Sequence, residues 1–129
     1  MNRENLFKAK RKDNGEWVEG YMVKYPSGKV EIFKKCVEPP DVLLRCEVDP
    51  KTICEYTGLE DKNDKEIWEN DIVRNEKGDI GVVQWFEEHA AFMIWNKTKH
   101  YICYLAENDF SKIEIAGNEF DNPELLEVE

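Results

Sequence analysis

The most reactive side chains of this sequence are those of four cysteines and two histidines. His100 and Cys103 stand three residues apart in a segment that is typical of a strand, so they point to opposite faces and cannot share a metal ion. A Cys–His nucleophile would pair Cys54 or Cys103 with His89 or His100, but it also needs a third group that orients the base. The spacing supplies no such group, and buried structural thiols are the favoured alternative. The sequence therefore predicts no catalytic residue and no metal site.

The cysteines also bear on the cellular compartment. They show no paired Cys-x-x-Cys spacing, which disfavours a structural zinc site: Cys36, Cys46, Cys54 and Cys103. Two disulfides could form, but the N-terminus is charged and lacks the apolar stretch of a secretory signal. Reduced thiols and a cytoplasmic location are therefore expected. No apolar run approaches the roughly 18 residues that a membrane span needs, so no membrane partner is expected.

Carboxylates are abundant, but their pattern does not predict acid–base chemistry. Glu60 with Asp61, and Glu87 with Glu88, are neighbours in sequence, and neighbouring strand residues point to opposite faces. The seven glycines are scattered at turns, so no phosphate-binding loop is present. We therefore expect a protein that is not an enzyme and that binds no cofactor.

Charge is distributed unevenly along the chain. Residues 1–35 hold nine Lys and Arg against five Asp and Glu, a formal charge of +4, whereas residues 36–129 carry −14. An acidic body repels phosphate, which disfavours general nucleic-acid binding. The basic N-terminal section could instead meet an acidic surface on this chain or on another copy. Ordinary solvated charge is the simpler alternative.

Aromatic side chains form the second notable group, and Trp85 and Phe86 are adjacent in a predicted strand. They point to opposite faces, so at most one of them belongs to a core. The other must meet solvent, the N-terminal strands, a partner or a second copy. Small barrels can present an aromatic groove that binds peptides, methylated side chains or bases. A core also consumes aromatic side chains, and we favour packing between domains or subunits over a ligand groove.

Alternation and turn residues predict a three-stranded β-meander over residues 6–35. Asn14-Gly15 is a strong hairpin signal, because both residues tolerate positive φ. Alternation places three lysines on the solvated face of the first strand: Lys8, Lys10 and Lys12. Pro39-Pro40 then interrupts the pattern. We expect one domain over residues 1–48, comprising the meander and a linker, and a second over residues 49–129.

The second domain is predicted to be a small β-barrel or sandwich, because short strands recur about every 8–12 residues with turns between them. Residues 58–65 are predicted to be a turn. Asn122-Pro123-Glu124 combines an N-cap residue, a first-turn proline and an acid, which predicts a short C-terminal helical turn. The expected fold is thus mainly β.

Three blocks of the sequence resemble the YopX family of phage and prophage proteins. The first block includes Asn-Gly-Glu-Trp-Val-Glu-Gly-Tyr at residues 14–21, after residues 7–11. The other two cover residues 52, 56–59, 61–63, 65–69 and 71–73, and residues 115, 117–118 and 122–126. Residues 30–47 and 75–110 carry little of the match. The resemblance implies an SH3-like barrel preceded by further β-structure, and it brings no established activity and no catalytic residues.

Two departures from the family pattern give a conformational prediction. The family usually has glycine where this chain has Asp64 and Asn70. Asp and Asn are the other residues that best tolerate a left-handed backbone. We therefore expect φ to be positive at one or both positions.

The resemblance implies a phage-derived protein in a bacterial host, and the residue pattern favours an interaction or self-assembly protein in the cytoplasm. Its partner would be a second copy or a host or phage protein, and the expected interface residues are Lys8, Lys10 and Lys12 with Trp85 or Phe86. The alternative is a nucleic-acid-associated protein. In that case the basic meander would bind nucleic acid, or the acidic surface would imitate DNA toward a host DNA-binding protein.

Overall fold

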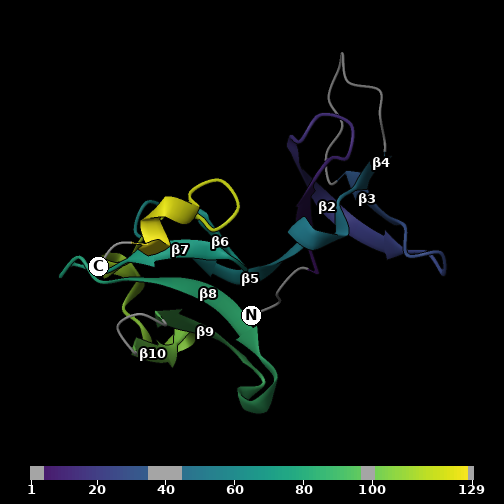
Figure 1. Cartoon of the computed structure of the whole chain (residues 1–129). Helices are drawn as coiled ribbons and strands as arrows, with labels where there is room; N and C mark the ends of the chain where they lie inside the picture. The colour runs from purple at the N-terminus through teal and green to yellow at the C-terminus, as the bar shows by residue number, and fades with distance from the viewer. Residues whose placement is uncertain (1–4, 35–44, 97–100, 128–129) are drawn as a thin grey trace. The chain divides into compact units, whose positions relative to one another are not determined.

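The computed structural model describes residues 5–34, 45–96 and 101–127 of the chain. In these residues the regular structure consists of β-strands and short 3₁₀ helices, as Figure 1 shows. The prediction of a mainly β fold is therefore confirmed. The chain divides into two compact units, residues 1–56 and 57–129. This division falls inside a strand, whereas the domain boundary expected from the sequence falls after residue 48.

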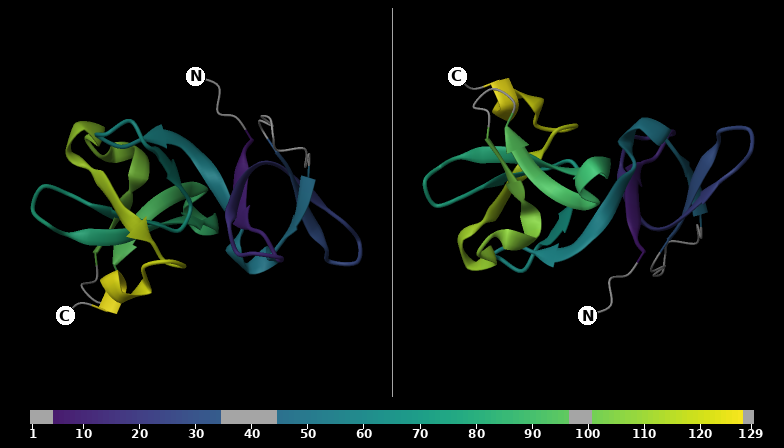
Figure 2. Two further views of the ribbon diagram at one scale, coloured as in Figure 1. Left: turned by 90° about the horizontal axis from the view of Figure 1, so that it is seen from above. Right: turned by 90° about the horizontal axis from the view of Figure 1, so that it is seen from below.

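Four antiparallel strands build most of the first unit: β1 (Phe7–Lys10), β2 (Trp17–Lys24), β3 (Val30–Lys34) and β4 (Arg45–Val48). β1 pairs with β2, β2 with β3 and β3 with β4, so the predicted meander is present. An isolated bridge between Arg11 and Val48 links the ends of β1 and β4. The sheet thus curls back toward its own first strand, which can be followed in Figure 2. Its inner face buries a small core: Ala9, Val30, Ile32 and Val48.

The turn between β1 and β2 contains the predicted Asn14-Gly15 pair, with a positive φ at Gly15 and not at Asn14. Gly15 has a φ of 76°, and the side-chain oxygen of Asn14 accepts a hydrogen bond from the backbone N–H of Glu16 at 2.9 Å. Arg11 contacts Asp13 through two side-chain hydrogen bonds of 2.9 and 2.6 Å. The turn therefore fixes the register that places alternate β1 residues inside and outside.

β5 (Cys54–Glu60) extends the first sheet and runs across the division between the two units. It pairs with β1, and β6 (Glu66–Trp68) follows it, giving the strand order β4-β3-β2-β1-β5-β6. The sequence pattern missed β6, and part of the predicted turn over residues 58–65 belongs to β5. Gly58 has a φ of 85°, so the glycine that favoured a turn lies within a strand.

The second unit is organised around a five-stranded antiparallel sheet with the order β10-β9-β8-β7-β11. Its strands are β7 (Asp71–Arg74), β8 (Ile80–Phe86), β9 (Ala91–Asn96), β10 (Tyr101–Tyr104) and β11 (Glu114–Asn118). Six buried side chains form its core: Ile67, Val73, Val83, Ile94, Leu105 and Ile113. The core lies against one face of the sheet, because Val73, Val83 and Ile94 alternate with residues of the other face.

No closed barrel is found among the described strands. β10 and β11 stand at the two edges of the five-stranded sheet, and the paired strands β5 and β6 belong to the other sheet. A pattern of short strands and turns fixes local elements, but it does not determine which edge strands pair. The antiparallel β-structure is present, whereas the SH3-like closure is not confirmed.

The backbone prediction from the two family departures is confirmed at both positions. Asp64 has a φ of 61° and Asn70 a φ of 74°. Ala90, which the sequence did not single out, has a φ of 47° and ends the 3₁₀ helix η2 (Glu87–His89). An alanine in this region is strained relative to glycine.

Short 3₁₀ helices connect several strands: η1 (Pro50–Thr52), η3 (Leu105–Glu107), η4 (Phe110–Lys112) and η5 (Pro123–Glu127). η5 is the predicted C-terminal helical turn. The side-chain oxygen of Asn122 accepts from the backbone N–H of Asn118 at 3.2 Å. Asn122 therefore ties the turn to the end of β11.

Candidate functional site

Several residues that carry the family resemblance hold turns in place. Asp61 is buried, and one of its carboxylate oxygens accepts from the backbone N–H groups of Asn63 and Lys65 at 2.8 and 3.0 Å. The other oxygen accepts from the N–H of Ile115 at 2.9 Å. Burial raises the pKa of Asp61, but these three backbone donors outweigh it, and the net pKa is lowered. Asp61 is a structural carboxylate that joins the β5–β6 turn to β11.

Thr57 and Asn118 have similar structural roles. The hydroxyl of Thr57 donates to the carbonyl of Ile67 at 2.6 Å and accepts from the N–H of Leu59 at 3.2 Å. The side-chain oxygen of Asn118 accepts from the N–H groups of Phe120 and Asp121, both at 2.9 Å. These polar groups stabilise backbone that a β ladder does not satisfy.

The candidate nucleophiles and bases have structural surroundings. Cys54 is buried and its thiol donates to the carbonyl of Thr52 at 3.3 Å. Cys103 packs against the core of the second unit. His89 is exposed, and its Nδ1 lies 3.3 Å from the hydroxyl of Tyr104. His100 lies outside the described residues. Within the described ranges, no three His, Cys, Asp or Glu side chains are grouped so that they could hold a metal ion.

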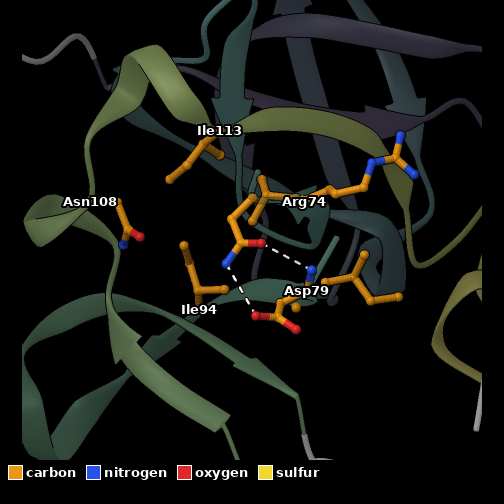
Figure 3. A pocket seen from close by; sticks show the side chains of 9 residues that line it. Arg74, Asp79, Ile94, Asn108 and Ile113 are labelled. Carbon is orange, nitrogen blue, oxygen red and sulfur yellow. Dashed lines mark hydrogen bonds between the residues drawn. The ribbon is translucent and has the colours of Figure 1, made fainter. Parts of the chain in front are cut away.

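Two cavities lie among the described residues, one in each unit. Figure 3 shows the first cavity, whose lining includes Asn75 and Asp79. A hydrogen bond of 3.4 Å joins these two side chains. The cavity has a volume of about 10 Å³, which is room for one water molecule. The second is an open depression of about 350 Å³ on the first unit. Its cations are partnered, since Arg11 pairs with Asp13 at 2.6 Å and Lys12 with Glu47 at 3.2 Å.

The outer side of the first unit combines cations with aromatic rings. Lys8 and Lys10 place their ammonium groups 4.8 and 5.4 Å from the ring centroid of Trp17. On the same face of β2, Tyr21 is 51% exposed, and its partner across the ladder is Phe33. We call this surface the cationic-aromatic face; its members are Lys8, Lys10, Trp17, Tyr21 and Phe33. Two of the three predicted lysines belong to it, while Lys12 lies in the following turn.

Acidic groups near this face are largely compensated. Glu31 is buried, and its carboxylate accepts from the hydroxyl of Tyr25 at 2.6 Å. This bond is the main cause of the lowered pKa of Glu31, with Lys29 and Arg45 also contributing. Arg45 also lies 5.8 Å from the ring of Phe33. Glu19, opposite Lys8 in the β1–β2 ladder, is an acidic residue that is exposed on this face.

The other predicted interface residues end β8, just before the turn to β9 that lies at the bottom of Figure 1. Trp85 is 42% exposed and contacts Phe92 edge-on, with ring centroids 5.2 Å apart. Phe86 instead contacts Trp95 at 5.9 Å and His89 at 6.3 Å. The two residues thus point to opposite faces, as alternation requires.

Two exposed acids, Glu87 and Glu88, follow Trp85 and Phe86 in η2. We call Trp85, Glu87 and Glu88 the hairpin tip. Its acidic character continues in the unit that carries it, because residues 57–129 hold seven Lys and Arg against 18 Asp and Glu. Residues 1–56 hold 11 against 10, so the two units differ in formal charge by twelve elementary charges.

The sequence analysis singled out Lys8, Lys10 and Trp85, which lie on these surfaces, but it did not single out Tyr21 or Phe33. The signal that could have found them is the alternation of β2, in which Trp17, Glu19 and Tyr21 share a face with Lys8 and Lys10. In the described part of the chain, no helix has the length and apolar character needed to cross a membrane.

Comparisons with known proteins agree on one family. The family model described as YopX protein matches residues 6–127. The X-ray crystal structure of protein yopX from Bacillus subtilis is similar, with a TM-score of 0.54 over 94% of this chain and 97% of that chain, at 14% identity. At this identity the similarity concerns the fold. The search of curated proteins gave no match.

Proposed function

Since the chain belongs to the YopX family, we propose that it is a phage- or prophage-derived protein that acts without catalysis, as a protein-interaction or self-assembly module. We place it in the cytoplasm of a bacterial host. The observation that carries this proposal is that one surface presents Lys8 and Lys10 and the other Glu87 and Glu88, each together with an exposed aromatic side chain. Tyr21 is 51% exposed on one surface and Trp85 42% exposed on the other. Exposed aromatic residues beside charges are typical anchors of protein interfaces.

The surroundings of the polar residues support a role without catalysis. Asp61, Thr57 and Asn118 use their oxygens on backbone donors. A catalytic carboxylate or hydroxyl would instead face a cavity that admits substrate. The second unit is, in this proposal, an SH3-like barrel whose outer surface serves for docking. In the described strands β10 and β11 are the two edges of the sheet. An experimental structure of the whole chain that also leaves these edges unjoined would limit this part of the proposal to an open sheet.

The test combines sedimentation velocity with affinity capture of the tagged chain from host cells in which the prophage is induced. Two variants, Tyr21→Ser and Trp85→Ser, each remove one exposed ring. The control variants change other exposed positions to serine: Lys24→Ser and Glu124→Ser. We expect the aromatic variants to lose association or captured partner protein, while the controls keep both. A purified chain that stays monomeric at about 200 µM and whose capture is unaffected by either aromatic change would overturn the proposal.

A nucleic-acid-associated role is the second candidate, because the cationic-aromatic face combines lysines with rings on which bases can stack. A mobility shift with single-stranded DNA or RNA that weakens as salt rises would favour direct binding. Capture of a basic DNA-binding host protein, lost at high salt, would favour imitation of DNA by the acidic unit.

A further inference from the structure

Resting on the proposed interaction function, we propose that the cationic-aromatic face of one copy docks onto the hairpin tip of a second copy. Lys8 and Lys10 lie two residues apart on one strand, so their Cα atoms are about 7 Å apart. Both ammonium groups are held near one indole, at 4.8 and 5.4 Å from the ring centroid of Trp17. A partner carboxylate that meets this pair therefore finds cations already positioned, which reduces the entropy lost on binding.

The apolar part of the receiving surface lies beside these cations. Tyr21 is 51% exposed and Val23, on the same side of β2, is 37% exposed. Phe33 pairs with Tyr21 across the ladder, so neighbouring strands form one continuous strip. A large aromatic side chain from a partner can bury itself there while its flanking acids reach Lys8 and Lys10.

The hairpin tip has the matching chemistry. Trp85 is held in place by its edge-on contact with Phe92, at 5.2 Å between centroids, yet it remains 42% exposed. Glu87 and Glu88 follow after one intervening residue, Phe86. The turn is fixed by a hydrogen bond of 3.1 Å from the N–H of Ala90 to the carbonyl of Glu87. An exposed ring at the end of β8 and two exposed carboxylates in η2 thus lie within four residues of chain.

A second copy is favoured as the occupant because one chain carries both complementary surfaces. Residues 57–129 are strongly acidic, whereas residues 1–56 hold 11 Lys and Arg against 10 Asp and Glu. Contacts of unlike surfaces join copies head to tail and produce rings or filaments. The surfaces are small, so we expect a dissociation constant on the order of 10 µM. A rise in salt from about 0.05 to 0.5 M should weaken association about tenfold.

Charge reversal tests this pairing by sedimentation velocity and light scattering. One variant combines Lys8→Glu with Lys10→Glu, and another combines Glu87→Lys with Glu88→Lys. Each should weaken self-association at least tenfold, since each leaves like charges facing one another. An equimolar mixture should recover association, because both contacts between the two variants are then of opposite sign. A chain with all four substitutions should also self-associate. The matched controls reverse the same number of charges at other exposed positions. One control combines Lys24→Glu with Lys51→Glu, and the other combines Glu60→Lys with Glu124→Lys.

The outcomes separate this pairing from the broader function. Recovery in the mixture and in the fourfold variant would support it. Association that survives either reversal, or a mixture that stays monomeric, would overturn the pairing but leave the interaction function in place. A strictly monomeric wild type at about 200 µM would overturn self-association, and the capture experiment above would then decide the interaction function. Binding of single-stranded nucleic acid that only the Lys8 and Lys10 reversal abolishes would assign the face to the second candidate function. Circular dichroism should show that each variant is folded.

Discussion

Asp61 should be among the most sensitive positions for stability, because one buried side chain satisfies three backbone N–H groups. In Asp61→Asn a single oxygen can still accept from Asn63 and Lys65, but the new amide places a donor against the N–H of Ile115. A hydrogen bond to a charged acceptor contributes about 1.5–3 kcal/mol, and a neutral one about 1 kcal/mol. We therefore expect Asp61→Asn to cost about 2–4 kcal/mol and Asp61→Ala about 3–5 kcal/mol. Both are large fractions of a typical folding free energy.

Urea unfolding followed by tryptophan fluorescence measures this loss, since the chain has four tryptophans. Asp64→Asn is the matched control, because Asp64 is exposed in the same turn and Asn tolerates its φ of 61°. The control should change the free energy of unfolding by less than about 0.5 kcal/mol. Equal stability of Asp61→Asn and the control would refute the assignment of Asp61 as the link between turn and strand.

The pH dependence of unfolding gives an independent check. The pKa of Asp61 is lowered in the folded state, so its carboxylate stabilises the fold above the unfolded pKa of about 3.9. This contribution is lost as pH falls through the folded pKa. The difference in unfolding free energy between wild type and Asp61→Asn should therefore shrink as pH falls from about 6 toward 2. Asp13 and Asp109 also have lowered pKa values, but they titrate equally in both proteins.

Three further predictions concern the second unit. Gly81→Ala should cost about 1–3 kcal/mol in urea unfolding, because the added Cβ would lie 2.7 Å from Ile94 Cγ2 and 3.1 Å from the Trp95 carbonyl oxygen. Ala90→Gly should leave stability unchanged or raise it by up to about 1 kcal/mol, since the φ of 47° suits glycine better; a loss would show that this backbone is not strained. Burial raises the pKa of Glu119, although its hydrogen bond with Gln84 opposes the shift. The free energy of unfolding of the wild type should then fall as pH rises from the pKa of Glu119 in the unfolded state through its pKa in the folded state. Glu119→Gln should remove this fall, so the variant should be more stable than the wild type at pH near 7.

Local features were predictable where one residue type has one strong preference. Asn14-Gly15 predicted its turn, and the family departures predicted positive φ at Asp64 and Asn70, because few residues tolerate that backbone. β6 was missed because it has three residues, too few for alternation to register. Closure of the second unit could not be judged, because strand pairing depends on long-range contacts that spacing does not encode.

For the candidate surfaces too, the sequence predicted which side chains share a face but not which of them contact one another. Alternation correctly separated Trp85 from Phe86 and placed Lys8 beside Lys10. It did not reveal that Trp17 holds both ammonium groups, because that contact requires the β1–β2 register, in which Lys10 lies opposite Trp17. Ala90 could not be foreseen either, since nothing in its residue type favours a positive φ.

The residues that carry the family resemblance include both residues with structural roles and residues of one candidate surface. Thr57, Asp61 and Asn118 lie in matched blocks and stabilise turns, which explains why the resemblance predicts a fold and no reaction. Residues 7–11 and 14–21 also lie in a matched block, and they include the lysines and the tryptophan of the cationic-aromatic face. The hairpin tip lies within residues 75–110, which carry little of the match. If the two surfaces meet, most of the receiving side therefore lies in a block that carries the resemblance, Phe33 excepted, whereas the hairpin tip lies where the resemblance is weak.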